Sequence, residues 1–283
     1  MFSIRRDDYF IDTYNSISEV YNDLKDKKPR DGAEDSSESG SYGFTETYSL
    51  EEAFDLMIRG DEKIYKKITD AVKKIDITKI LGNVIKKNSN YNDIVGYQAN
   101  VPNYLKGIPT DMINVNPTRK SQKIINIIVN GSVSAMMDTE DIIKISSYYY
   151  LVIDLLEKSG YRCNVYVMSN FSEEDDGYIL VRAKVDREPF NKYKMAFLLV
   201  NPSFHRRIGF KWIECCNCKG EPTDCGYGKP ITDVDKIKDI FDKEMKCNFI
   251  VWSLQKDFQL KVEDIIERLK KDGIKIGDEI NEK

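Results

Sequence analysis

Residues 123–135, KIINIIVNGSVSA, contain the strand around which this chain is predicted to fold. Residues 124–129 are β-branched with one exception, and such a run is typical of a strand that is buried on both faces of a parallel sheet. The run ends at the small polar residues 130–134, and a helical pattern begins at Asp138 or Thr139. Because ligands of open α/β sheets bind outside the carboxyl ends of strands, this turn is the first candidate for a functional site.

The segments that follow predict an α/β domain over residues 121–275. An amphipathic helix at 138–159 and an alternating strand at 163–167 complete a strand–helix–strand unit, whose crossover is expected to be right-handed. Alternating polar residues at 178–186 predict an antiparallel edge strand. The predicted fold class is α/β, with a mostly parallel central sheet and helices on both faces. Further helices are predicted at 189–200, 202–207, 232–245 and 257–272, and further strands at 210–214 and 248–254.

The rest of the chain divides by composition into four segments. Residues 1–27 mix charged and aromatic residues at helical spacing, which predicts a helical or flexible N-terminal region. Residues 28–45 are rich in Ser, Gly and acidic residues and predict a disordered linker, with a phosphorylated or partner-binding tail as the alternative. Residues 46–120 predict two helices, the first capped by Ser49 with a Glu three residues later, and then a long loop packed against the domain. Residues 276–283 are predicted to be a tail.

Composition excludes several classes of function. The net charge of −4 gives no general attraction to nucleic acid, and no apolar run reaches the roughly 18 residues that a membrane-spanning helix needs. The six cysteines stand in a chain without a secretory signal pattern, so reduced thiols are expected. The sequence therefore predicts a cytoplasmic protein that binds neither nucleic acid nor membrane.

The turn after the first strand carries the motif Asn130-x-Ser132-x-Ser134. It resembles the metal-site signature of von Willebrand factor A domains, which is written Asp-x-Ser-x-Ser at the same place. The predicted sheet, whose third strand is the antiparallel edge strand at 178–186, is similar to that family as well. The resemblance covers residues 121–275 and implies a Mg²⁺ site held by the two hydroxyls and the carboxylate. This chain has Asn130 where the family has Asp, and a neutral amide is a poorer ligand for a hard cation. Two interpretations stay open, a Mg²⁺ site and a polar turn that caps the next helix.

A second resemblance extends over most of the chain after Tyr48. The phrases SLEEAFDLMIRG, VPNYLKGIPTDM, INIIVNGSVSA and NPSFHRRIGF, in this order, look like a family of uncharacterised bacteriophage-encoded proteins. This resemblance implies a phage or prophage origin and brings no activity with it.

A cysteine-rich loop offers a different metal site. Cys215 and Cys218 have the spacing of zinc ligands, and Cys225 could supply a third thiolate. The alternatives are free thiols or a reversible disulfide.

The single histidine, His205, is the only imidazole that could act as a base. It stands in NPSFHRR, which is expected to begin a surface helix, and neither Ser132 nor Ser134 has the flanking glycines of a nucleophile elbow. A Ser–His enzyme is therefore disfavoured, and the basic residues beside His205 are expected to be solvated.

Together these patterns favour a non-enzymatic protein-interaction module that binds a protein at the carboxyl edge of its sheet. The von Willebrand factor A resemblance suggests an AAA+ ATPase as partner, by analogy of fold. The alternatives are a Mg²⁺-dependent enzyme or metal-dependent adhesion-type site at residues 130–134, and a zinc module.

Overall fold

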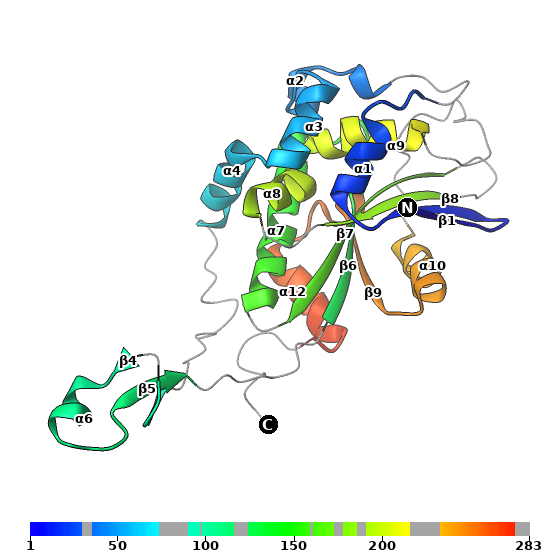
Figure 1. Cartoon of the computed structure of the whole chain (residues 1–283). Helices are drawn as coiled ribbons and strands as arrows, with labels where there is room; N and C mark the ends of the chain where they lie inside the picture. Colours follow the sequence, from blue (N-terminus) through cyan, green and yellow to red (C-terminus); the bar gives the residue numbers. More distant parts are fainter. Residues whose placement is uncertain are drawn as a thin grey trace.

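The computed structural model describes residues 1–29, 36–73, 90–96, 98–115, 124–158, 161–172, 178–185, 191–215 and 233–274. Most of these residues form one body built on a six-stranded sheet, and a small second sheet stands apart from it (Figure 1). Among the described residues, no helix is long and apolar enough to cross a bilayer.

The main sheet has the strand order β1-β2-β8-β7-β6-β9. Strand β6 lies between β7 and β9 and is parallel to both, and β2 is parallel to β8, whereas the pairs β7–β8 and β1–β2 are antiparallel. The predicted α/β class, with a mostly parallel sheet, is therefore confirmed. The strands are β1 (Phe2–Arg5), β2 (Tyr9–Tyr14), β6 (Ile124–Asn130), β7 (Arg162–Ser172), β8 (Tyr178–Lys184) and β9 (Phe249–Ser253).

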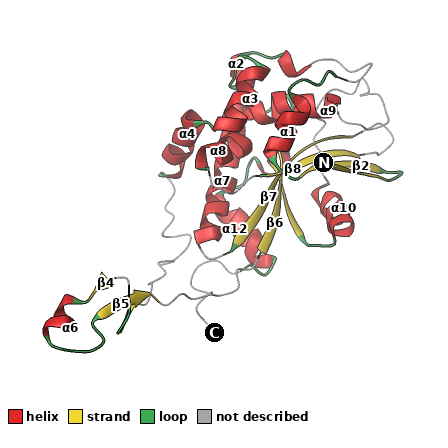
Figure 2. Ribbon diagram, in the orientation of Figure 1, coloured by secondary structure: helices red, strands yellow, loops and turns green. Residues whose placement is uncertain are grey.

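Helices cover the two faces of this sheet unequally (Figure 2). Most of them pack into one apolar core with Ile127 and Val129 of β6, whereas Ile237 and Phe241 of α10 pack on the opposite face with Ile128. The helices of the main body are α1 (Ile17–Leu24), η1 (Ser36–Glu38), α2 (Tyr42–Thr45), α3 (Leu50–Arg59), α4 (Glu62–Val72), α7 (Thr139–Lys158), α8 (Lys192–Val200), η2 (Phe204–Gly209), α9 (Phe210–Cys215), α10 (Val234–Met245), α11 (Leu254–Asp257) and α12 (Val262–Lys271).

The N-terminal region is not purely helical, because the strands β1 and β2 precede α1. All six residues of β2 are buried, and β2 pairs with β8. The prediction that β8 is an edge strand was therefore wrong. The polar alternation that suggested an edge comes partly from Arg182, a residue that is 3% exposed and whose guanidinium lies over the rings of Tyr166, Phe241 and Phe249.

The linker prediction was wrong for residues 36–45, which belong to the folded body, while residues 30–35 lie outside the described part. Ser37 and Thr45 are fully buried. The short helices η1 and α2 lie in this segment. Residues 36–47, here called the strap, pack against η2 and α9.

Residues 90–115 form a small unit of their own, here called the projection. Strands β3 (Asn90–Asp93) and β4 (Gln98–Ala99) pair on either side of β5 (Met112–Val115), and α6 (Val101–Leu105) connects β4 to β5. The long loop that was predicted to pack against the domain instead stands away from it (Figure 1). The helices predicted just before it are present as α3 and α4, and Ser49 accepts a hydrogen bond from the amide of Glu52 at 3.1 Å. The predicted tail at 276–283 lies outside the described residues.

Candidate functional site

The turn that follows β6 is closed by its own polar side chains. Asn130 Oδ1 accepts a hydrogen bond from the Ser132 amide at 3.1 Å, and Ser134 Oγ accepts one from the Met136 amide at 3.2 Å. The Ser134 amide in turn donates to Oε1 of Gln255, just past β9, at 2.8 Å. These contacts place all three residues of the motif at the carboxyl edge of the sheet.

The Ser132 hydroxyl is engaged with the backbone of the neighbouring strand. Its Oγ donates to the carbonyl of Asn170 at 3.0 Å and accepts from the amide of the same residue at 2.8 Å. Ser132 is also buried, with 7% of its surface exposed. Ser132 Oγ therefore already uses its proton and one of its two lone pairs within the fold. In the described part of the chain, no three His, Cys, Asp or Glu side chains gather closely enough to hold a metal ion.

His205 lies directly against this turn and not on the surface, so the expectation of a surface helix was wrong. Its side chain is 6% exposed, and its ring occupies the space beside Gly131, where a Cβ atom would lie 1.5 Å from the imidazole Cε1. Burial, with a smaller contribution from the positive charge of Arg206, lowers the pKa of His205 to about 3. The imidazole is therefore neutral at physiological pH.

The basic residues beside His205 are buried as well, which corrects the prediction that they are solvated. Arg206, 3% exposed, donates to the carbonyls of Phe44 and Met137 at 2.7 and 2.8 Å, and its guanidinium lies 3.8 Å from the centroid of the Phe44 ring. Burial lowers the pKa of Arg206 to about 10, so it stays charged at neutral pH. Among the described residues, no carboxylate forms an ion pair with Arg206.

Arg207 holds the strap. It is fully buried and donates to the carbonyls of Ser37 at 2.9 Å and Thr47 at 3.1 Å, and to the Thr47 hydroxyl at 2.8 Å. Longer bonds of 3.3 to 3.4 Å reach Ser39, Gly40 and Thr45. The guanidinium is thus coordinated almost entirely by oxygen atoms of one segment. All three residues, 205–207, lie in η2, a π-helix, and wide helical turns of this kind occur frequently at functional sites.

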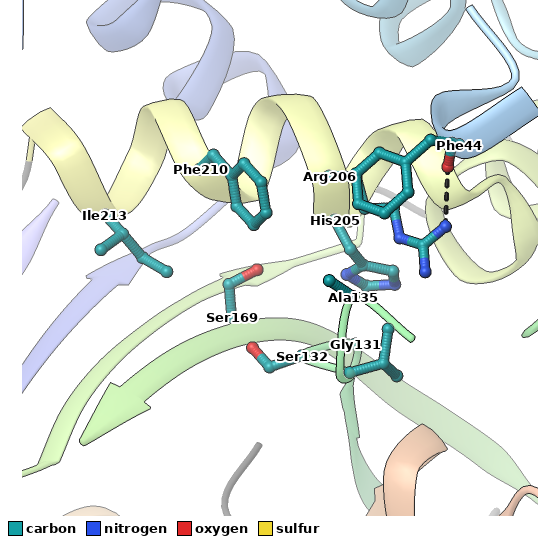
Figure 3. Close-up of a pocket in the computed structure, with 10 residues that line it drawn as sticks. Phe44, Gly131, Ser132, Ala135, Ser169, His205, Arg206, Phe210 and Ile213 are labelled. Atoms are coloured by element: carbon teal, nitrogen blue, oxygen red, sulfur yellow. Dashed lines mark hydrogen bonds between the residues drawn. The ribbon is translucent and has the colours of Figure 1, made fainter. Parts of the chain in front are cut away.

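A small cavity lies between the turn after β6 and the π-helix (Figure 3). Its volume is about 20 Å³, enough for one water-sized group, and it opens partly to solvent. Ser169 and His205 bring polar atoms to it, and in Figure 3 the imidazole lies between Arg206 and the turn at Gly131. The residues that line it are Phe44, Gly131, Ser132, Val133, Ala135, Ser169, His205, Arg206, Phe210 and Ile213.

Buried polar atoms without hydrogen-bond partners are concentrated at this edge of the sheet. Within the described part, they include Ser169 Oγ, both ring nitrogens of His205 and Nε of Arg206. On the strand ends themselves, Nδ2 of Asn130, both side-chain polar atoms of Asn170 and Oγ of Ser253 are also without partners. Asn130 at the end of β6 is paired in register with Ser253 at the end of β9. Strand β6 has β7 on its other side, so the strand order switches direction here. Open α/β sheets bind ligands at the carboxyl ends of the strands at such a switch point.

The predicted zinc site lies mostly outside the described residues, which contain Cys215 but neither Cys218 nor Cys225. Cys215 is 3% exposed, and its thiol points toward the carbonyls of Lys27 and Lys28, at 3.9 and 3.5 Å. The zinc prediction therefore remains a prediction.

The projection presents a second candidate surface, of a different chemical kind. Between residues 92 and 113, none of its described side chains is buried. Half of the large apolar side chains that the described chain exposes lie in this unit, with Leu105 77% exposed, Val95 70% and Tyr104 68%. The unit is held by its backbone ladder and by asparagines: Asn100 donates to Asn92 Oδ1 at 3.0 Å, and Asn103 donates to the Thr110 carbonyl at 2.9 Å. The exposed set is Ile94, Val95, Val101, Tyr104, Leu105 and Ile108.

The sequence pointed to the turn after β6 but missed the residues that complete the cavity. Ser169 lies in the second half of β7, and nothing in an alternating strand marks one serine as facing a cavity. Gly209 is a weak sequence signal for this close approach. A Cβ at Gly209 would lie 2.6 Å from Ser169 Oγ, so only a glycine lets the helix pass this close to β7.

Comparison with curated proteins and with solved structures gives no match. One family model, described as a domain of unknown function, DUF7192, matches residues 5–273. The match includes the main sheet from β2 onward, the strap, the π-helix and the projection. The chain therefore belongs to the DUF7192 family.

Proposed function

We propose that this protein is a non-enzymatic protein-interaction module and that the projection is the surface that binds its partner. The observation that carries the proposal is that the projection turns its apolar side chains outward while burying none of those described. A sheet of this size gains little stability from its own contacts, so apolar residues on it are best explained by a partner that covers them.

The exposed area is large enough for specific binding. The six apolar residues are 39–77% exposed and together expose on the order of 700 Å², which approaches the roughly 800 Å² that one partner contributes to a standard interface. The charged residues of the described unit are only Asp93, Lys106 and Asp111. Apolar contact is therefore expected to dominate over charge attraction. The partner that fits this surface is a protein with an apolar groove or patch of its own.

The carboxyl edge of the main sheet supports direct partner binding less well. Asn130 and Ser132 are 0% and 7% exposed, and the π-helix covers the turn between them. The exposed part of the turn lies at Ala135 and Met136, the latter 93% exposed.

The test is a matched pair of double variants. Tyr104→Ser with Leu105→Ser removes two of the most exposed apolar side chains of the projection, and Tyr48→Ser with Met136→Ser removes a pair from the main body that is at least as exposed. Each variant and the wild type are used as affinity bait in cells of the source organism, and bound proteins are quantified by mass spectrometry. We expect a protein that is enriched by the wild type and by the Tyr48/Met136 variant and is lost with the Tyr104/Leu105 variant. Equal loss with both variants, or equal enrichment by all three baits, would reject the projection as the interface.

A further inference from the structure

A second site is built into the main body, independently of the projection. The cavity between the turn after β6 and η2 combines a buried positive charge with polar atoms that have no partner in the described structure. Arg206, Ser169 and His205 are 3%, 2% and 6% exposed, and all three line this one space. None of the residues that line it is acidic.

Buried charges are costly unless an opposite charge or a full set of hydrogen bonds compensates them. The guanidinium of Arg206 bonds to backbone carbonyls and to the hydroxyl of Thr139, at 3.3 Å, but its Nε–H is unused. Buried polar groups of native proteins are almost always hydrogen-bonded, so three such groups around one space call for a bound group that supplies acceptors.

We propose that this cavity binds one oxygen of a small oxyanion, the carboxylate or phosphate group of a ligand whose remainder lies at the mouth. A space of about 20 Å³ admits a single oxygen atom, and its partly open side leaves room for the rest of the anion. The hydroxyl of Ser169 and the one N–H of neutral His205 are unpartnered donors on residues that line the cavity, and Arg206, which also lines it, adds a positive charge. Donors that meet an ionised oxygen form the stronger class of hydrogen bond.

The walls of the cavity restrict what the rest of the ligand can be. Phe44, Phe210 and Ile213 line the space above the polar atoms, and Ala135 lines the turn side (Figure 3). The ligand class that fits is therefore an acid with an apolar portion next to its anionic group. Phe44 belongs to the strap, so the strap forms one wall of the site.

The single histidine makes a direct test possible, because the imidazole signals in an NMR spectrum can only come from His205. Inorganic phosphate and acetate are titrated separately at pH 7 and constant ionic strength, with NaCl as the reference salt. We expect a saturable change in the ring ¹⁵N and ¹H shifts with at least one oxyanion and no saturable change with NaCl. Saturation with phosphate alone assigns a phosphate ligand, and saturation with acetate alone assigns a carboxylate. No saturable change with either anion would overturn the proposal.

The chain also offers a matched pair of substitutions. Ser169 and Ser146 are both buried serines whose hydroxyls have no partner in the described structure, but only Ser169 lines the cavity. Ser169→Ala should raise the dissociation constant of the anion about tenfold, as expected for loss of one hydrogen bond to a charged group, whereas Ser146→Ala should leave it unchanged. An equal effect of both substitutions would show that the anion acts on the fold and not in this cavity.

Discussion

Acidification should destabilise this protein through one residue, His205. Its pKa is lowered to about 3 by burial and, secondarily, by Arg206, whereas an unfolded histidine titrates near 6.5. Between these two values the unfolded chain binds a proton that the folded chain does not. The free energy of unfolding therefore falls as the pH is lowered from 6.5 toward 3. The stability of the fold with a neutral His205 is fully present only above pH 6.5.

The size of this effect follows from the two pKa values. Each pH unit within the window contributes about 1.4 kcal/mol, so lowering the pH from 7.5 to 5.0 should reduce the free energy of unfolding by about 2 kcal/mol. At pH 5.0 most carboxyl groups with ordinary pKa values near 4 are still ionised, so the histidine dominates this range. The assay is urea denaturation at several pH values, followed by the fluorescence of Trp212 and Trp252, which are 0% and 2% exposed.

The control is His205→Gln, which keeps a polar side chain but removes the ionisable group. This variant is expected to be less stable than the wild type at pH 7.5, and to lose the 2 kcal/mol difference between pH 7.5 and 5.0. If the wild type and His205→Gln show the same dependence on pH, then His205 is not held neutral in the folded state and the reasoning fails.

Two further predictions concern the contacts around His205. Gly131→Ala should lower the free energy of unfolding by about 1–3 kcal/mol, because its Cβ would lie 1.5 Å from the imidazole. Gly43→Ala, whose Cβ meets no atom within 4 Å, should leave the Tm unchanged or slightly raised. Equal melting temperatures of the two variants would contradict this packing. Arg207→Met should cost about 3 kcal/mol or more and make the strap sensitive to a glutamyl endopeptidase, since several buried hydrogen bonds are lost together. Arg59→Met is the control, because the Arg59 side chain is 77% exposed, and the same protease sensitivity in both variants would count against the role of Arg207.

The parts of the fold that could be predicted are those in which local pattern and tertiary environment agree. The β-branched run of β6 is buried as its composition requires, and α7 begins at Thr139, where a start was expected. The Ser49 cap of α3 is equally local, since donor and acceptor are three residues apart. These features depend only on neighbours in sequence or on burial as such.

The errors arose where the tertiary environment outweighs the local pattern. Residues 210–214 alternate like a strand, yet α9 is helical because it continues η2 and packs Trp212 against Tyr14, with ring centroids 5.4 Å apart. The edge assignment of β8 failed for a related reason, since β2 reaches it from more than 160 residues away in sequence. The pairing of β2 with β8 cannot be inferred from either strand alone.

Two of the wrong predictions have one physical cause. Residues 36–45 of the strap were predicted to be disordered because they have little apolar content, and residues 205–207 were predicted to be solvated because they are basic. The strap has backbone carbonyls that need hydrogen-bond donors, and the buried Arg207 has donors that need acceptors. Short stretches rich in Ser and Gly leave backbone carbonyls free of regular secondary structure, and the guanidinium of Arg207 offers five donors to bind them.

This pairing also links the strap to the proposed anion site. Arg207 fixes the strap, the strap positions Phe44, and Phe44 and Arg206 form one side of the cavity. If the pairing is what orders this wall, Arg207→Met should weaken anion binding at His205 even though Arg207 does not line the cavity. The imidazole shifts of that variant, titrated with the anion that saturates the wild type, would show it, and an unchanged dissociation constant would separate the strap from the site.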